Sequence, residues 1–362
     1  MQDSIEIDKI ITTEKEPLYY LESWSHERDP NDKLICQPYD YLSGLPSNNN
    51  NIRSKFIHLF DELFFKDTAH NPKVAKINEV ISILHNSSLL IDDIEDNSKY
   101  RRGFPSAHVK FGTPLTINCA NLMYFKAMDV AANVLHETNV SQSNEGVDQF
   151  NHDQRLRDLN HDIVQEMINL HNGQGLDIYW RDYLPELKLL PTIEEYLYMV
   201  QNKTGGLFRL SVKLLSAYSR NRPNQEMLNK IIAIANSAGI IYQIRDDYLN
   251  LVDARYSTMK GIAGEDLIEG KLSLPILINL RNEKDPANSP VHKILYDFRS
   301  LKLRSKQPDL LQKAVTYLHD TGSMTQTHLV LMKFKEKFHK LLNEFEYGDS
   351  ELYKLIEALC DV

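Results

Sequence analysis

The sequence predicts an all-α protein, a single large helical bundle with a central cavity. Apolar residues recur at spacings of three and four through most of the 362-residue chain, and little strand-like alternation is present. Hydrophobic residues make up 42% of the sequence, which is enough for a large buried core. Length alone would favour two domains, but polar motifs scattered from Arg53 to Lys271 must converge on one site, which favours one.

The N-terminal residues 1–34 are polar, and we expect them to be an extension that precedes a domain spanning residues 35–362. The first residues are too acidic for a secretory signal or a transit peptide, and no apolar run is long enough to span a bilayer. Three widely spaced cysteines, without metal-ligand spacing, favour a reducing compartment. We therefore expect a cytoplasmic protein without a transmembrane segment.

An acidic cluster, residues 92–96, ends a strongly apolar helical stretch and is followed by two arginines. At about 100° per residue, His85, Asp92 and Asp96 lie on one helix face. Carboxylates four residues apart repel each other and oppose the helix dipole near a C-terminus, so a cation should compensate them. Carboxylate oxygens suit Mg²⁺, which commonly joins one or two carboxylates to substrate phosphates. Taken alone, this motif also fits a solvated acidic turn.

Residues 139–160 are rich in Asn, Gln, Asp and His, and we expect a polar insertion with little regular structure. Further along, residues 196–201 and 207–218 both have a helical pattern around Gly205-Gly206. A loop between two helices is one interpretation of the glycine pair. Because both flanking segments have a helical pattern, we favour an interruption within one long helix, and such a kink would expose backbone carbonyls.

A second acidic pair, Asp246-Asp247, follows the apolar stripe of a helix predicted over residues 227–251. Two helices that present carboxylates across a cavity can hold several Mg²⁺ ions against one diphosphate. Downstream, Lys260 and Lys271 lie in Gly-containing segments whose ammonium groups can reach phosphate oxygens, although both also fit ordinary surface lysines. The net charge of −9 is unsuited to nucleic acid, so local cations and Mg²⁺ must hold an anionic substrate.

Together, these motifs resemble the trans-isoprenyl diphosphate synthases, most closely their fungal and animal geranylgeranyl diphosphate synthases. The matching segments, in order, are Pro38-Tyr39, residues 85–96, Arg101-Arg102-Gly103, Gly173-Gln174-Gly175-Leu176-Asp177, Lys203-Thr204-Gly205-Gly206 and residues 242–248. The resemblance covers roughly residues 35–280 and implies the helical bundle of the isoprenoid synthases. It also implies a homodimer.

The resemblance implies prenyl transfer: an allylic diphosphate ionises, the double bond of isopentenyl diphosphate attacks the cation, and a proton is lost. Its implied metal ligands are carboxylates, with the last acting through water: Asp92, Asp93, Asp96, Asp246 and Asp247. Its implied contacts to the allylic diphosphate are cationic: Arg101, Lys203, Lys260 and, as a weaker match, Lys271.

Other positions match the acceptor pocket for isopentenyl diphosphate, where guanidinium groups suit phosphate geometry: Arg53, His85 and Arg102. Matches to the family's cation-stabilising groups are the backbone of Lys203-Thr204, the Thr204 hydroxyl and the Gln243 amide oxygen. Gln174 and Asp177 match residues close to the metal-bound waters and Lys203.

Product length is expected to depend on pocket depth. Small residues, Ser87 and Ser88, occupy the fifth and fourth positions before Asp92, where shorter-chain relatives often carry an aromatic, so a twenty-carbon product is expected. By resemblance, the floor candidates are Tyr124, Phe125 and His171, although they fit equally well as residues packed in a helical core.

The sequence departs from the family pattern at two places. The family usually has Gly-Lys shortly before the arginine that matches Arg53, whereas this chain has Asn49 and Asn50. The missing lysine should weaken acceptor binding. At the end of the second acidic motif, Asn250 replaces an aspartate, which removes one charge without removing the metal pair.

We therefore expect a Mg²⁺-dependent prenyltransferase that joins isopentenyl diphosphate to an allylic diphosphate, with farnesyl diphosphate as the expected primer, to give geranylgeranyl diphosphate. Three alternatives are a farnesyl diphosphate synthase, a class I terpene cyclase that needs no acceptor pocket, and a non-catalytic partner subunit that tolerates the Asn49-Asn50 change. The two intact aspartate clusters argue against the non-catalytic alternative.

Overall fold

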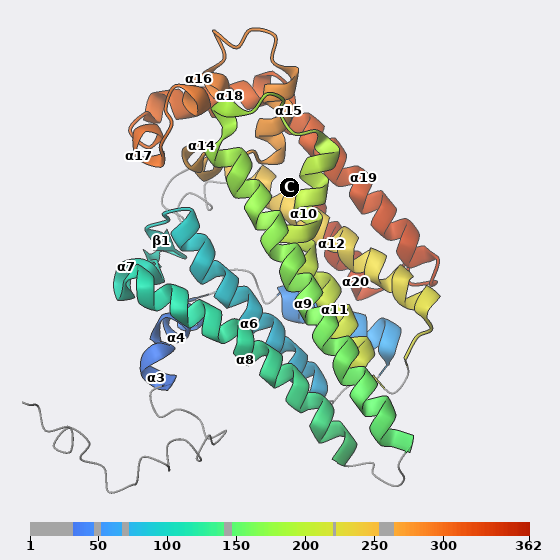
Figure 1. The fold of residues 1–362 in the computed structure, drawn as a ribbon. Helices are drawn as coiled ribbons and strands as arrows, with labels where there is room; N and C mark the ends of the chain where they lie inside the picture. Colours follow the sequence, from blue (N-terminus) through green and yellow to red (C-terminus); the bar gives the residue numbers. More distant parts are fainter. Residues whose placement is uncertain (1–31, 47–51, 67–71, 141–146, 220–221, 253–263) are drawn as a thin grey trace, which may run out of the picture.

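The computed structural model describes residues 32–46, 52–66, 72–140, 147–219, 222–252 and 264–362. The predicted N-terminal extension up to residue 31, the Asn49-Asn50 departure and Lys260 lie outside the described residues. The chain is a bundle of helices, which confirms the all-α prediction (Figure 1). Strand structure in the described part is limited to an antiparallel pair of two-residue strands, β1 (Tyr100–Arg101) and β2 (Phe104–Pro105).

The first half of the bundle contains, in chain order, α3 (Asp32–Ile35), α4 (Gln37–Gly44), α5 (Ile52–Phe60), the π-helical turn η1 (Asp61–Phe65), α6 (Pro72–Glu95), α7 (Ala107–Phe111), α8 (Thr113–Val140) and α9 (Val147–Asp182). The second half contains the 3₁₀ turn η2 (Leu184–Glu186), α10 (Ile193–Lys203), α11 (Gly205–Tyr218), α12 (Gln225–Val252), α14 (Glu265–Glu269), α15 (Leu274–Asn282), α16 (Pro290–Tyr296), α17 (Leu301–Arg304), α18 (Pro308–Asp320), α19 (Ser323–Asn343) and α20 (Glu351–Cys360).

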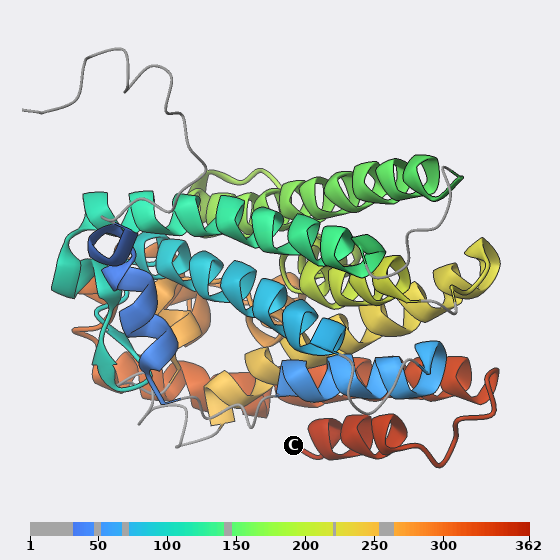
Figure 2. The same ribbon diagram turned by 90° about the horizontal axis from the view of Figure 1, so that it is seen from below.

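Long helices pack pairwise around one hydrophobic core. Helix α6 lies along α8, α9 packs on α10 and α11, and α12 packs against α11 and α19 (Figure 1). Helices from the two halves of the chain meet, because α5 lies beside α20 (Figure 2). The core cluster runs from Cys36 to Cys360, so it draws on nearly the whole described chain.

Several helices begin at residues whose side chains cap the free backbone N–H groups of the first turn. Helix α10 begins with a capping box, in which the Thr192 hydroxyl accepts from the Glu195 backbone N–H and the Glu195 carboxylate accepts from the Thr192 N–H. Helix α20 begins at a Ser350 cap. The helix predicted over residues 227–251 is confirmed as α12, within two residues at each end.

The prediction that residues 139–160 have little regular structure is wrong, because α9 is helical from Val147. Composition misled the prediction. Leu156, Leu159 and Ile163 follow each other at spacings of three and four, and all three are packed against the core. That stripe ties the polar stretch to the bundle and extends the helix.

Candidate active site

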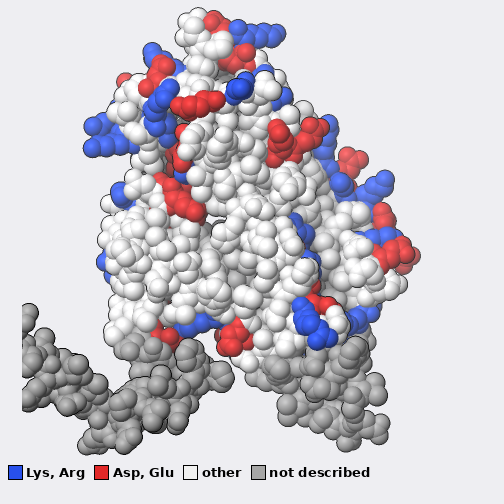
Figure 3. Space-filling model, in the orientation of Figure 1, with Lys and Arg blue, Asp and Glu red and all other residues white. Residues whose placement is uncertain are grey.

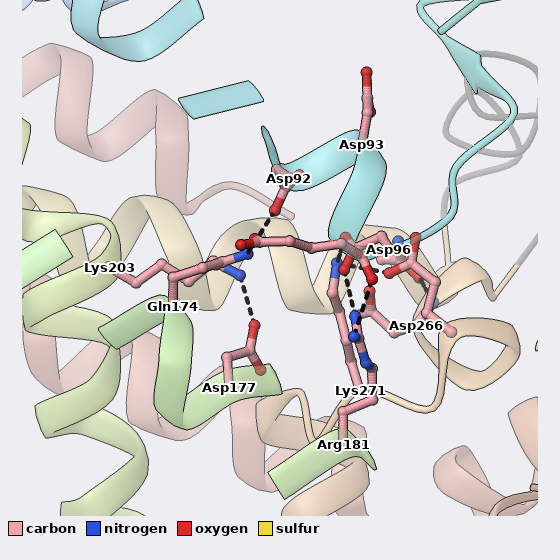
Figure 4. A network of polar contacts seen from close by, with 12 residues as sticks. Asp92, Asp93, Asp96, Gln174, Asp177, Arg181, Lys203, Asp266 and Lys271 are labelled. Carbon is pink, nitrogen blue, oxygen red and sulfur yellow. Dashed lines mark hydrogen bonds and ion pairs between the residues drawn. The ribbon is translucent and has the colours of Figure 1, made fainter. Parts of the chain in front are cut away.

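The carboxyl end of α6 carries the first acidic cluster. Helix α6 ends at Glu95, and the Asp96 N–H still donates to the Asp92 carbonyl at 2.8 Å. Asp93 and Asp96 are buried, and Asp92 is half-buried. Asp92 and Asp96 extend toward the network of polar contacts, whereas the Asp93 side chain points the other way (Figure 4). The carboxylates of the acidic cluster therefore point to two sides of α6.

Arg101 neutralises the Asp93 side of the cluster. The β1–β2 hairpin returns the chain toward α6, where the Arg101 Nε donates to the Asp93 Oδ1 at 2.8 Å and its Nη2 reaches the Asp92 Oδ2 at 3.1 Å. Burial raises the pKa of Asp93 to about 6, although the Arg101 charge opposes that rise. Burial disfavours the Arg101 cation, but the two aspartates hold its pKa above the ordinary value.

Asp96 is bound by two cations at once. Arg181, from the end of α9, donates to its Oδ1, and the Lys271 Nζ donates to its Oδ2 at 2.9 Å (Figure 4). Lys271 also pairs with Glu269 at 2.6 Å. Burial disfavours the Lys271 ammonium, but Asp96 and Glu269 raise its pKa well above the ordinary value. Both oxygens of Asp96 are therefore engaged.

Helix α9 adds a second polar layer through Gln174 and Asp177. The Gln174 Nε2 donates to the Asp92 Oδ1 at 3.1 Å and to the Glu95 Oε2 at 2.8 Å. The Lys203 Nζ donates to the Asp177 Oδ2 at 2.5 Å, and this pair lies beside the α6 carboxylates (Figure 4). Burial disfavours both charged forms, but each partner stabilises the other, so the pKa of Asp177 is lowered and that of Lys203 is raised.

The helix interruption that the sequence predicted is present, because α10 ends at Lys203 and α11 begins at Gly205. Two glycines allow neighbouring helices to approach it. A Cβ on Gly173 of α9 would lie 2.4 Å from the Lys203 backbone nitrogen, and one on Gly239 of α12 would lie 2.7 Å from the Gly205 Cα. Close backbone packing from both sides therefore fixes Lys203 at the interruption.

A line of hydrogen bonds connects the interruption with the second acidic pair. The Thr204 hydroxyl donates to the Gln243 Oε1 at 2.6 Å, and the Gln243 Nε2 donates to the Asp247 Oδ1 at 2.8 Å. The Tyr196 hydroxyl and the Leu274 N–H both donate to the Asp247 Oδ2, at 2.5 Å and 2.8 Å. Burial raises the pKa of Asp247 to about 6. Asp247 thus serves as a buried hub for three helices, whereas Asp246 is only half-buried.

The predicted acceptor residues come together around His85. Burial and the nearby charges of Arg53, Arg102 and Arg101 lower the pKa of His85 well below its ordinary value, so its imidazole is neutral. Arg102 has a left-handed backbone, with φ of 56°, and its Nη1 donates to the Leu45 carbonyl at 3.4 Å. Burial lowers the pKa of Arg53.

The candidate chain-length residues are only partly brought together. Ser87 is fully buried and its hydroxyl donates to the Ile83 carbonyl, whereas Ser88 is half-buried on the same face as His85 and Asp92. Tyr124 and His171 contact each other, with ring centroids 5.8 Å apart. Phe125 does not join them in the single chain, because its side chain is 70% exposed.

The described part of the chain holds no group of three or more carboxylate, imidazole or thiolate side chains placed to bind a metal on their own. The donors nevertheless fit a hard cation shared with a substrate, because Mg²⁺ is usually held by one or two carboxylates together with phosphates and water. The Asp92 and Asp96 carboxylates supply such donors, and Lys203 and Lys271 supply cations for phosphate oxygens. The arrangement can therefore bind a metal–diphosphate pair.

Sequence reasoning missed Arg181 and Tyr196. Arg181 is seven residues after Gln174 and four after Asp177, so helical spacing alone could have placed it on the same face of α9. Tyr196 carried no comparable signal, because its partner Asp247 is 51 residues away in the chain.

On the surface, Asp and Glu residues gather beside a hollow on the face seen in Figure 1 (Figure 3). Among the described helices, none is long and apolar enough to cross a bilayer.

Comparison with known proteins gives consistent matches. The polyprenyl synthetase family model matches residues 32–316. A geranylgeranyl pyrophosphate synthase of Eremothecium gossypii is 40% identical over 301 residues, which cover 82% of this chain and 84% of that protein. One from Dictyostelium discoideum is 37% identical, covering 93% of this chain and 96% of that protein. One from Fusarium fujikuroi is 37% identical, covering 90% and 67%.

Proposed function

This chain belongs to the polyprenyl synthetase family, and we propose that it is a prenyltransferase that joins isopentenyl diphosphate to an allylic diphosphate to give geranylgeranyl diphosphate. Farnesyl diphosphate is the expected primer. The observation that carries the proposal is a network of carboxylates and cations: Asp96, at the end of α6, pairs with Arg181 and Lys271, and Lys203 of α10 pairs with Asp177 of α9 beside them. Such a network suits a reaction whose leaving group is a diphosphate.

Divalent-metal dependence is general in this family, and we propose Mg²⁺ as the metal. The proposed ligands are carboxylates: Asp92, Asp93, Asp96 and Asp246. When bound, Mg²⁺ supplies positive charge against the diphosphate as it departs. Asp247 is proposed to act on the metal through water, as its two oxygens already accept hydrogen bonds from protein donors. It also orients Gln243.

The allylic diphosphate would be held by cations that are already next to the acidic cluster. Arg101, Lys203 and Lys271 are each paired with a carboxylate in the described structure, at 2.5 to 3.1 Å. A bound diphosphate offers these side chains new acceptors, and guanidinium and ammonium groups both suit phosphate oxygens. Lys260 remains a further proposal for the same role, outside the described residues.

The acceptor diphosphate is proposed to bind to Arg53, His85 and Arg102. Neutral His85 can donate one ring N–H without adding to the charge of two neighbouring guanidinium groups. The isoprenoid cation would face the Thr204 hydroxyl and the Gln243 amide oxygen, which lie 2.6 Å apart. Fixed dipoles of this kind stabilise a developing positive charge without reorganising during the reaction.

The alternatives are not favoured. A terpene cyclase has no use for a cationic acceptor pocket, yet the charges of Arg53 and Arg102 both act on His85. The curated relatives named above are synthases of geranylgeranyl pyrophosphate rather than of the shorter farnesyl product. A non-catalytic subunit would have no need of the intact carboxylate and cation network.

We also propose a homodimer in the cytoplasm. Exposed apolar side chains on α8 and α9 support a contact surface there: Ile117, Phe125, Val164 and Ile168 are 39 to 70% exposed. Three free cysteines suit a reducing compartment. Sedimentation of the parent and of Val164→Glu would test the dimer, because a charge in an apolar contact should release monomers.

The proposed activity is tested by incubating purified protein with Mg²⁺, farnesyl diphosphate and labelled isopentenyl diphosphate, followed by phosphatase treatment and separation of the alcohols by length. A twenty-carbon alcohol that disappears in Asp92→Ala is the expected result. Release of cyclised hydrocarbon without the acceptor would support a cyclase instead. No extension at high acceptor concentration would support a partner subunit.

A further inference from the structure

Arg304 is a buried cation that lies outside every sequence motif of the site. It ends the short helix α17 and its side chain lies beneath the turn that follows α14. Only 7% of the residue is exposed. Burial lowers the pKa of Arg304 to about 10, so the guanidinium stays charged near neutral pH. A buried cation of this kind needs specific partners to offset its lost hydration.

The partners of Arg304 are backbone carbonyls. Its Nε donates to the Ile268 carbonyl at 2.7 Å, its Nη2 to the Glu269 carbonyl at 2.6 Å and its Nη1 to the Phe298 carbonyl at 2.9 Å. Ile268 and Glu269 end helix α14, where carbonyls lose their helical partners. The guanidinium fork therefore closes the carboxyl end of α14, two residues before Lys271.

The turn between α14 and Lys271 is shaped around this guanidinium. Gly270 has a left-handed backbone, with φ of 83°, and an added Cβ there would lie 2.7 Å from the Arg304 Nη2. The Gly270 and Lys271 N–H groups both donate to the Asp266 carbonyl, at 2.8 and 2.9 Å. These bonds fix the backbone from which the Lys271 side chain extends to Asp96 and Glu269.

We propose that Arg304 is a positioning residue, which acts through the α14 turn to hold Lys271 at the diphosphate site. The inference rests on the proposed function, since Lys271 is there given a contact to the allylic diphosphate. Lysine cannot replace the fork, because one ammonium cannot reach carbonyls that lie around three separate guanidinium nitrogens. The hydrogen bonds of Arg304 go to backbone carbonyls, so its proposed effect on the site passes through Lys271.

The test compares Arg304→Met with Arg299→Met as the matched control. Arg299 lies five residues earlier in the chain, and its side chain is 67% exposed and paired with Glu186 at the surface. Arg304→Lys is a milder second variant, and thermal melting followed by circular dichroism establishes that each variant is folded. The probe ligand is inorganic pyrophosphate with Mg²⁺, measured by calorimetry.

In Arg304→Met we expect pyrophosphate to bind about tenfold more weakly and the KM of the allylic substrate to rise by about the same factor. The KM of the acceptor should stay within about twofold of the parent, because a lost contact to one substrate affects that substrate's binding. Hydrogen exchange at the Gly270 and Lys271 amides should quicken. Arg304→Lys should show part of each effect, and Arg299→Met none.

A double variant separates positioning from general stability. If Arg304 acts through Lys271, adding Arg304→Met to Lys271→Ala should cause little further loss of pyrophosphate affinity, because both changes remove the same contact. Full additivity of the two changes would overturn the inference, as would unchanged amide exchange in a folded Arg304→Met. Parent protein that binds pyrophosphate but forms no prenyl product would overturn the proposed function alone.

Discussion

The Gln243 side-chain amide donates to Asp247 at 2.8 Å, and this bond turns its oxygen toward the Thr204 hydroxyl. An amide has a donor end and an acceptor end that are easily exchanged by rotation. The carboxylate of Asp247 accepts and does not donate when it is ionised, so it selects one of the two orientations. Gln243 therefore presents its oxygen toward the helix interruption.

The Tyr196 hydroxyl should matter because it holds Asp247 in place. Tyr196→Phe removes one of the donors to the Asp247 Oδ2 and leaves that buried oxygen with the Leu274 N–H. We expect the free energy of unfolding to fall by about 1–3 kcal/mol and kcat to fall about tenfold. Tyr198→Phe on the same helix is the control, since Tyr198 is 60% exposed. Equal kcat values for the two variants would contradict this account.

Glycine at position 173 is predicted to be essential for the position of Lys203. Gly173→Ala places a Cβ 2.4 Å from the Lys203 nitrogen, so α9 and the interruption must separate. We expect a loss of at least about 1–3 kcal/mol in stability and a loss of turnover. Gly175→Ala is the matched control, because a Cβ there meets nothing within 4 Å, and it should gain up to about 1 kcal/mol. Thermal melting and a turnover assay measure both effects.

Product length is predicted to depend on the size of the side chains at positions 87 and 88. Ser88→Phe puts a ring on the face of α6 that carries His85 and Asp92, so the product should shorten from twenty carbons toward fifteen. Ser87→Phe should also shorten the product if it folds, but Ser87 is fully buried and the larger side chain should cost about 1–3 kcal/mol. Chromatography of the dephosphorylated products, with exposed Ser82→Phe as control, measures this. Unchanged length in folded Ser87→Phe and Ser88→Phe would refute the pocket account.

Restoring a lysine before Arg53 should strengthen acceptor binding. Asn50→Lys supplies the charge that the family pattern contains and this chain lacks. A charge-assisted contact is worth about 1.5–3 kcal/mol, which corresponds to a fall of about ten- to hundredfold in the acceptor KM. Asn50→Gln adds length without charge and should leave the KM unchanged. Equal acceptor KM values in Asn50→Lys and Asn50→Gln would show that a lysine at this position does not strengthen acceptor binding.

Activity should decline as the pH falls through about 6. The pKa values of Asp93 and Asp247 are raised to about 6, in each case mainly by burial. Both groups are charged above that pH and neutral below it, so acidification weakens the Arg101 pair and frees the Gln243 amide. We expect kcat/KM to fall about tenfold per pH unit below 6, and more steeply where both protons matter. A profile that stays flat down to about pH 5 would contradict these roles.

More of the helices, and of the helix ends at which the site residues lie, could be predicted from the sequence than of the contacts between the helices. Apolar spacing located α12, and Gly205-Gly206 located the interruption before α11, because both are local properties. Arg181 binds Asp96, 85 residues away, and Arg304 binds Ile268, 36 residues away, and neither arginine lies in a motif. Composition failed for the start of α9, where a sparse apolar stripe outweighs the polar residues around it.

The double pairing of Asp96 sets up a competition within the site. A metal at this carboxylate competes with Arg181 and Lys271 for its oxygens, and a displaced cation keeps only its second carboxylate, Asp182 for Arg181 or Glu269 for Lys271. A diphosphate can accept that cation. We therefore expect metal and diphosphate to bind with positive coupling, each raising the affinity for the other by the same factor. Neither ligand alone would bind as tightly as its donors suggest, so the complete ion cluster forms only when the substrate is present.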